Sequence, residues 1–223
     1  MSFVYSTKHK LFFCVTQFGH FEAWDLRNPD SPMLTPIDLS VDEENYPIAS
    51  RSKEELELKK LCRTVKFLVV DQKSGDVFLA RRFILEQVDT NGSYVEVNYE
   101  NSVTGCDLGY PYKTIGFDVH KYDEDNRALR YMDGGSLDGL AFFIGLNHGF
   151  ALPAAEFPEL KPNSIYYTDV LSPPEWIDCI YGGHDLGIFS YQEGTISPCF
   201  FPCDVKSITR IMPVPTWFTP SRE

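Results

Sequence analysis

Four side chains near the C-terminal end of the chain are of the types that bind zinc, namely Cys179, His184, Cys199 and Cys203. Structural zinc sites usually contain a close cysteine pair such as C-x2-C on a tight turn. The nearest spacing here is C-x3-C, and it spans Pro202 at the end of an expected strand. We therefore interpret these cysteines as buried or half-buried thiols and expect no metal and no cofactor.

His148 lies at an expected turn in the segment Leu146–Gly149 and could act as a base beside a carboxylate. No G-x-S-x-G motif or other nucleophile motif accompanies it, and no strand-to-helix phosphate loop is present. A histidine that stabilises the turn is the simpler interpretation, so we expect no enzyme activity. The alternative is an all-β enzyme or metal-binding protein that uses His148, His184 and the nearby cysteines.

Trp176 is the residue that we select as a possible partner-binding anchor, because it lies in a loop (SPPEWID) and not in an expected strand. Aromatic residues are over-represented among the residues that dominate binding energy. In alternating strands, however, most aromatic side chains belong to the core. We weighed the same role for five other aromatic residues, namely Tyr166, Tyr167, Tyr181, Trp217 and Phe218.

The composition excludes several classes of partner. The 223 residues carry a formal net charge of −12, which opposes sequence-independent binding to nucleic acid or to an anionic membrane. There is no apolar run long enough for a transmembrane helix and no recognisable secretory signal. Most of the six cysteines lie in apolar runs, which indicates reduced thiols. We expect an intracellular protein, cytoplasmic or nuclear.

The elements that must position these residues are mostly short strands. In four places an apolar alternating strand is followed by a polar or glycine-containing turn and an apolar return. Recurrence of such units about every 50 residues favours the blades of a β-propeller. Because a closed propeller needs about four to eight blades, we predict an incomplete ring of about three to four in a single domain, 1–223. The four hairpins are Lys10–Leu26, Val65–Phe83, Ile115–Met132 and Leu186–Phe201.

Three further features refine this architecture. The segment Tyr112–Asn147 is expected to hold one blade with part of the next. Pro36 in Met33–Leu39 indicates an edge strand. The one helix expected is Ser52–Cys62, with Ser52 as N-cap and Glu55 completing a capping box, and its thin apolar stripe suits a short helix on the outside of a sheet.

Six segments together resemble one family, the plant F-box-associated β-propeller family of the kink-suppressed type. The resemblance implies a propeller that recruits a target protein, as the substrate-recognition part of an SCF-type ubiquitin ligase, and it implies no catalytic residues. The segments are Phe67–Phe83, Thr114–Lys121, Leu140–Pro153, Glu156–Asp169, Asp185–Tyr191 and Pro213–Ser221.

The chain departs from the full-length pattern of this family because no F-box is recognisable before Phe3. We therefore expect no direct binding to a Skp1-type adaptor and leave the target protein open. A decayed paralog without a stable fold is a further alternative, since an open stack of blades exposes unpaired strand edges.

Overall fold

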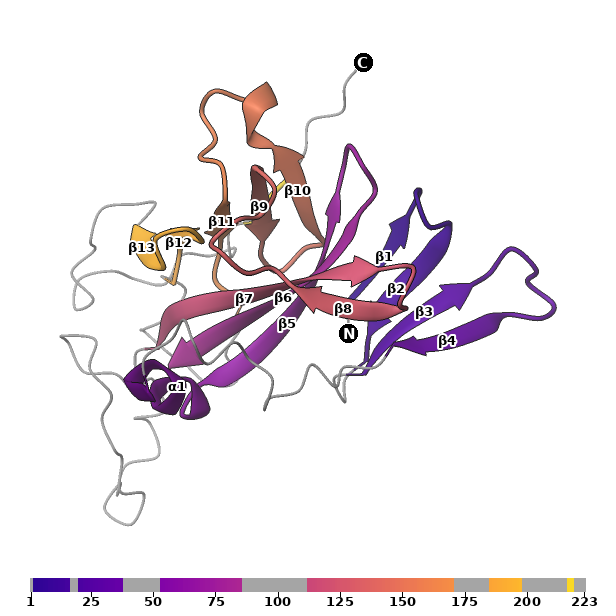
Figure 1. Ribbon diagram of the computed structural model, residues 1–223, viewed down its shortest axis with the longest axis horizontal. Helices are drawn as coiled ribbons and strands as arrows, with labels where there is room; N and C mark the ends of the chain where they lie inside the picture. The colour runs from indigo at the N-terminus through magenta and orange to yellow at the C-terminus, as the bar shows by residue number, and fades with distance from the viewer. Residues whose placement is uncertain are drawn as a thin grey trace, which may run out of the picture.

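The computed structural model of the chain describes residues 2–16, 20–37, 53–85, 112–170, 185–197 and 216–218. Within these residues the strands form two sheets, one of four strands and one of nine that curls on itself, with one short α-helix on the outside (Figure 1). The all-β expectation is confirmed.

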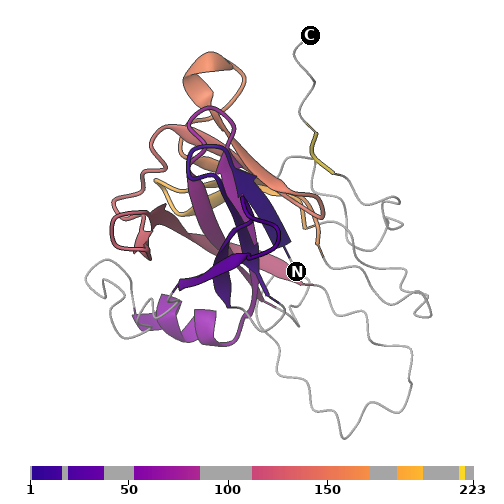
Figure 2. The same ribbon diagram turned by 90° about the vertical axis from the view of Figure 1, so that its right-hand side faces the viewer.

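The first layer is a four-stranded antiparallel meander, β1 (Ser2–Ser6), β2 (Leu11–Val15), β3 (Phe21–Asp25) and β4 (Met33–Ile37). The strands pair in chain order, so β4 is the outer edge. Pro36 lies in this edge strand as expected, because the N–H that proline lacks costs least there. We call this unit the first meander; it is the layer nearest the viewer in Figure 2.

The second meander consists of β5 (Arg63–Asp71), β6 (Val77–Leu85), β7 (Lys113–Asp123) and β8 (Ala128–Tyr131), again antiparallel and in chain order. The turn between β5 and β6 is built by Asp71, whose carboxylate accepts the backbone N–H groups of Lys73 and Ser74 at 3.0 and 3.2 Å. Gly75 then adopts a φ of +76°, a conformation that glycine reaches without a steric penalty.

The third group contains β9 (Leu140–Ile144), β10 (Gly149–Pro153), β11 (Ser164–Tyr167), β12 (Gly187–Ser190) and β13 (Thr195–Ser197), with a 3-10 turn, η3, at Ala154–Glu156. It extends the sheet from the free edge of β5 in the order β10-β9-β11-β12-β13, with parallel pairing of β10 to β5 and of β11 to β9. β9 therefore joins the third group and not β8, which agrees with the expected division of Tyr112–Asn147.

All four predicted hairpins are present as antiparallel strand pairs, β2–β3, β5–β6, β7–β8 and β12–β13. Local alternation and turn residues were sufficient to locate them.

Two apolar cores hold the three layers together. In β5, Leu68 and Val70 pack against the first meander, whereas Phe67 and Val69 pack against the third group. Such alternation means that the second meander is buried on both faces, as a blade inside a stack must be. Two meanders and a third group stacked in this way form an incomplete β-propeller.

One buried arginine joins the second meander to the third group. Arg82 of β6 is fully buried, lies 4.5 Å from the ring centre of Tyr167, and donates to Thr114 Oγ1, to the carbonyl of Thr168 and to Asp185. Its Nη2 is 2.9 Å from Asp185 Oδ2. A buried guanidinium that has these partners fixes both elements at once.

Helix α1 (Lys53–Lys60) lies on the outside of the second meander, as predicted. None of its residues is buried. Lys59 attaches it to the sheet, with Nζ 3.3 Å from Asp118 Oδ1 and 4.6 Å from the ring centre of Phe83.

Candidate functional site

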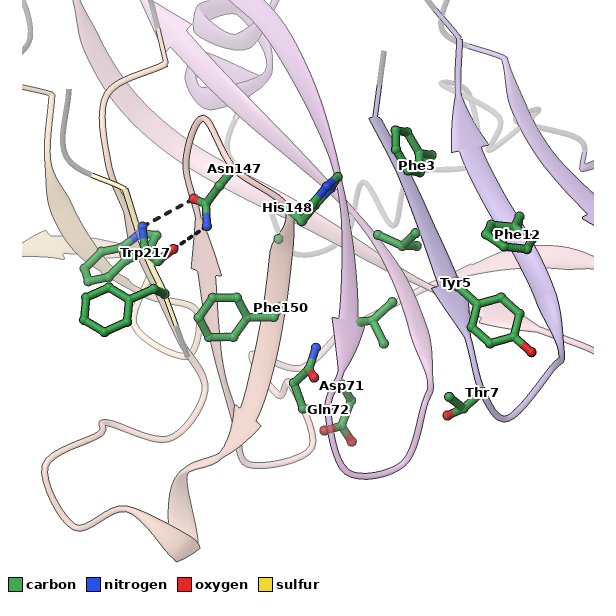
Figure 3. Close-up of a pocket in the computed structure, with 14 residues that line it drawn as sticks. Phe3, Tyr5, Thr7, Phe12, Asp71, Gln72, Asn147, His148, Phe150 and Trp217 are labelled. Atoms are coloured by element: carbon green, nitrogen blue, oxygen red, sulfur yellow. Dashed lines mark hydrogen bonds between the residues drawn. The ribbon is translucent and has the colours of Figure 1, made fainter. Parts of the chain in front are cut away.

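A groove of about 600 Å³ lies where β1, the β5–β6 turn and β10 come together (Figure 3). These elements belong to the first meander, the second meander and the third group, respectively. We call it the aromatic groove. Its main lining residues are Phe3, Tyr5, Phe12, Asp71, Gln72, Asn147, His148, Phe150, Trp217 and Phe218.

One wall of the groove is made by the first meander. Val4 of β1 points into the core, so its neighbours Phe3 and Tyr5 point to the other face, where Tyr5 contacts Phe12 of β2 with ring centres 4.8 Å apart. The ring of Phe3 reaches across to His148, 5.3 Å away in an edge-on contact. The groove is thus bridged at one point by an aromatic pair.

The opposite wall depends on a close approach of two strands. At Gly149 a β-carbon would lie 2.5 Å from the carbonyl oxygen of Leu68, so only glycine lets β10 pair with β5 here. The Gln72 N–H also donates to the carbonyl of Ala151 at 3.1 Å, which joins the β5–β6 turn to β10. Both contacts hold His148 and Phe150 at the groove.

Trp217 fixes the C-terminal part of the described chain beside the groove. Its backbone N–H donates to Asn147 Oδ1, its carbonyl accepts from Asn147 Nδ2, and its indole N–H donates to the carbonyl of Ile144 at 3.1 Å. Its ring packs edge-on against Phe143 and Tyr166. The next residue, Phe218, is left 83% exposed at the groove.

The polar groups of the groove serve mainly to hold its walls. Asp71 is buried and bonded within its turn, and Asn147 is bonded to Trp217. No lysine or arginine occurs among the described residues that line the groove. An apolar, aromatic surface of this kind suits side chains of a protein partner.

His148 lines the groove, and its ring contacts the ring of Phe3. Trp176 lies outside the described residues, as do Cys179, His184, Cys199 and Cys203, so the structure does not test the anchor or the zinc set. Among the residues that are described, no group of three or more His, Cys, Asp or Glu side chains is placed to hold a metal ion.

The two cysteines that the structure describes, Cys14 and Cys62, have thiols with raised pKa values. Burial raises the pKa of the Cys62 thiol to about 11. Burial, together with the nearby Glu22 carboxylate, also raises the pKa of Cys14. Thiols with raised pKa values are poor nucleophiles and poor metal ligands at neutral pH.

Of the aromatic residues weighed as anchors, Tyr166 and Tyr167 are buried, Trp217 docks onto its own chain, and Phe218 is exposed. Phe3, Tyr5 and Phe12 are groove residues that the sequence alone did not single out. Their signal was present, since β1 and β2 carry large apolar residues at both the odd and the even positions. Such strands have two apolar faces, and one of them needs a cover.

No helix within the described residues is long and apolar enough to cross a membrane.

Comparison with known proteins agrees with the fold. The family model described as the KIB1-4 β-propeller matches residues 2–190. An F-box protein of Arabidopsis thaliana is 44% identical over 59 residues, which are 26% of this chain and 14% of that protein. No solved structure matches the chain significantly. The match over most of its length shows that the chain belongs to the KIB1-4 β-propeller family.

Proposed function

We propose that this chain is a protein-recognition module whose target binds in the aromatic groove, and that it acts by binding, without catalysing a reaction. As part of a ubiquitin ligase it would be the half that selects the substrate. The propeller family and the similarity to an F-box protein support a role in protein interaction. We place it inside the cell, in the cytoplasm or nucleus.

The observation that carries this proposal is the exposed aromatic lining of the groove. Phe3, Tyr5 and Phe218 are large apolar side chains that remain open to water although the same chain buries dozens of others. Aromatic side chains beside a concave surface are the usual anchors of protein interfaces. Removing one such anchor typically costs about 2 kcal/mol or more of binding energy.

The test is differential capture of partners by the purified chain and by a groove variant, Tyr5→Ser with Phe218→Ser. We expect a specific partner to be retained by the wild type and lost, by a factor of roughly 30 or more in affinity, from the variant. Met33→Ser is the matched control, because Met33 is also exposed and lies in the first meander outside the groove. Partners that bind all three proteins equally would refute the groove as the site.

The ligase role needs its own measurement. A genuine substrate should accumulate in cells that lack the protein, and its ubiquitination should depend on the groove residues. A purified Skp1-type adaptor should not bind this chain directly. Direct adaptor binding would contradict that part of the proposal and leave target recognition by the groove to be judged separately.

A further inference from the structure

A second groove, of about 790 Å³, adjoins the aromatic groove. Asn147 and His148 line both of them. Strand β1 contributes Ser2 to the second groove, and Phe3 and Tyr5 to the aromatic groove. Figure 3 shows Phe3 and His148 together at one end of the aromatic groove. The two grooves therefore meet at the Phe3–His148 contact.

Strand β5 runs along both grooves. Its first residues, Arg63–Phe67, line the second groove, whereas Val70 and Asp71 near its end line the aromatic groove. Lys66 and Asp71 are five positions apart, which corresponds to about 17 Å along a strand. An extended segment of a partner covers this distance with about five residues. One bound segment is thus long enough to occupy both grooves.

The second groove differs in charge from the aromatic groove and from the chain as a whole. The chain has 32 Asp and Glu residues against 20 Lys and Arg. The described residues that line the second groove include Arg63, Lys66 and His148 but no Asp or Glu. We call it the basic groove. Three hydroxyl groups also line it, those of Ser2, Thr16 and Thr64.

The two cations of the basic groove leave β5 on opposite faces. Alternation along the strand puts Lys66 on the face of Leu68, which packs against the first meander. It puts Arg63 on the face of Phe67, which packs against the third group. Because lysine has three donor hydrogens and arginine five, each can donate to a ligand as well as to a contact within the chain. The basic groove therefore offers donors on both sides of β5.

Lys66 also lies directly opposite a second cation, Arg81 of β6. Like charges that face each other across two strands repel. Arg81 is held on its far side by the buried carboxylate of Asp118, with Nη2 3.3 Å from Oδ2. A negative group bound beside Lys66 would reduce the repulsion. A charge arrangement that costs stability in this way is typical of a functional site.

We propose that the basic groove binds an acidic side chain of the same protein whose apolar side chain binds in the aromatic groove. The inference rests on the proposed function and specifies it. The target presents an extended segment in which a large apolar residue and an Asp or Glu are about five positions apart. Because the chain as a whole is strongly negative, it repels a uniformly acidic partner and favours an acidic residue at this one place.

A carboxylate suits the basic groove better than a phosphate does. A phosphorylated side chain carries nearly two negative charges and is bound best where several cations converge on it. Arg63 and Lys66 lie on opposite faces of β5 and do not converge in this way. We therefore assign the basic groove to Asp or Glu.

The experiment starts with a phage-displayed library of random peptides of about 12 residues, more than twice the expected spacing, selected on the immobilised full chain. We expect the selected peptides to carry an aromatic or large apolar residue with Asp or Glu about five positions away. One such peptide is then synthesised with Glu, Gln or phosphoserine at the acidic position, and its binding is measured by fluorescence anisotropy. Replacing Glu by Gln should weaken binding by about five- to tenfold.

Two double variants of the chain remove the same charge from different places. Arg63→Ser with Lys66→Ser should weaken binding of the Glu peptide by about tenfold and leave binding of the Gln peptide nearly unchanged. Lys113→Ser with Arg130→Ser is the matched control, because both cations are exposed on strands of the second meander and neither lines one of the two grooves. The comparison of the Glu and Gln peptides on the wild type does not depend on how the variants fold.

The outcomes separate this inference from the proposed function. If Tyr5→Ser with Phe218→Ser abolishes peptide binding but the Glu and Gln forms bind the wild type equally, only the assignment of the basic groove is wrong. If that aromatic-groove variant binds every peptide as tightly as the wild type, the proposed function is wrong as well. Tighter binding of the phosphoserine form would overturn the choice of a carboxylate, and a library that yields no binder would overturn recognition of an extended segment.

Discussion

The two ends of the stack both carry aromatic residues, but those residues are buried at one end and exposed at the other. At the third-group end, Phe143, Phe150 and Tyr166 form an aromatic cluster that is buried, with Trp217 packed onto it. At the first-meander end, Phe3, Tyr5, Phe12, Trp24 and Leu34 lie on one face of the sheet, and all of them except Trp24 are more than a third exposed. The aromatic content of a sheet face therefore does not tell whether the face is buried or exposed. The difference between these two faces is that a short segment containing Trp217 packs onto one of them.

The interactions that join each end to the second meander differ as well. The third group is joined to the second meander by a fully buried guanidinium, Arg82, which has a carboxylate partner in Asp185. The first meander is joined to it by apolar packing and by ion pairs near the surface, such as Lys8 with Asp76 at 2.5 Å. We expect the first meander to be the more easily perturbed layer.

The largest effect should come from Arg82→Ala. The change removes the buried cation that pairs with Asp185 and the N–H donor of the Thr168 carbonyl, which typically costs about 3–5 kcal/mol. Urea unfolding measures the loss, and the wild type should unfold in one transition if residues 1–223 form one cooperative unit, as we propose. Arg27→Ala removes an ion pair with Asp25 that is closer, 2.5 Å against 2.9 Å, but whose guanidinium is exposed, so it should change stability little. Equal stability of the two variants would contradict the contrast.

Much of this architecture was accessible from the sequence because it is local. The β5–β6 hairpin follows from two apolar runs separated by Asp71, Ser74 and Gly75, whose turn chemistry is independent of the rest of the chain. The surface position of α1 follows in the same way from its charged composition.

The remaining features depend on contacts between distant residues. Nothing near Leu140 specifies that β9 lies between β10 and β11, with parallel pairing to β11. Likewise, Trp217 is held by hydrogen bonds with Asn147, seventy positions earlier, whereas its neighbour Phe218 is exposed. The alternation of apolar and polar residues predicts which face of a sheet a side chain is on. Whether another layer packs against that face depends on the tertiary fold.

Trp217→Ala should produce the next largest effect, because it removes the cover from the third-group end. We expect a loss of about 2 kcal/mol from the lost burial and the lost indole hydrogen bond. Phe218→Ala is the matched control and should leave stability unchanged, since its ring is exposed. Identical behaviour of the two variants would show that Trp217 does not act as a cover.

The smallest loss of stability is expected from Asp76→Asn, which removes the ion pairs between Asp76 and two lysines, one of them Lys8 of the first meander. Burial opposes the ionisation of this carboxyl, but hydrogen bonds and ion pairs with Lys121 and Lys8 outweigh it and lower its pKa from 3.8 to about 2. A group whose pKa is lowered on folding stabilises the protein above its unfolded pKa and loses that contribution as the pH falls through the folded pKa. After discounting for solvent screening, Asp76→Asn should cost about 1 kcal/mol at pH 7.

The difference in unfolding free energy between wild type and Asp76→Asn should therefore be constant at neutral pH and shrink between pH 3.8 and about pH 2. Asp138→Asn is the control, because Asp138 lies 3.5 Å from the same Lys121 and is more than half exposed. High salt should reduce the Asp76 effect but leave the Arg82 effect nearly unchanged, since screening acts weakly on buried pairs. If the difference in unfolding free energy changed with neither pH nor salt, apolar packing alone, without these charges, would hold the first meander against the second.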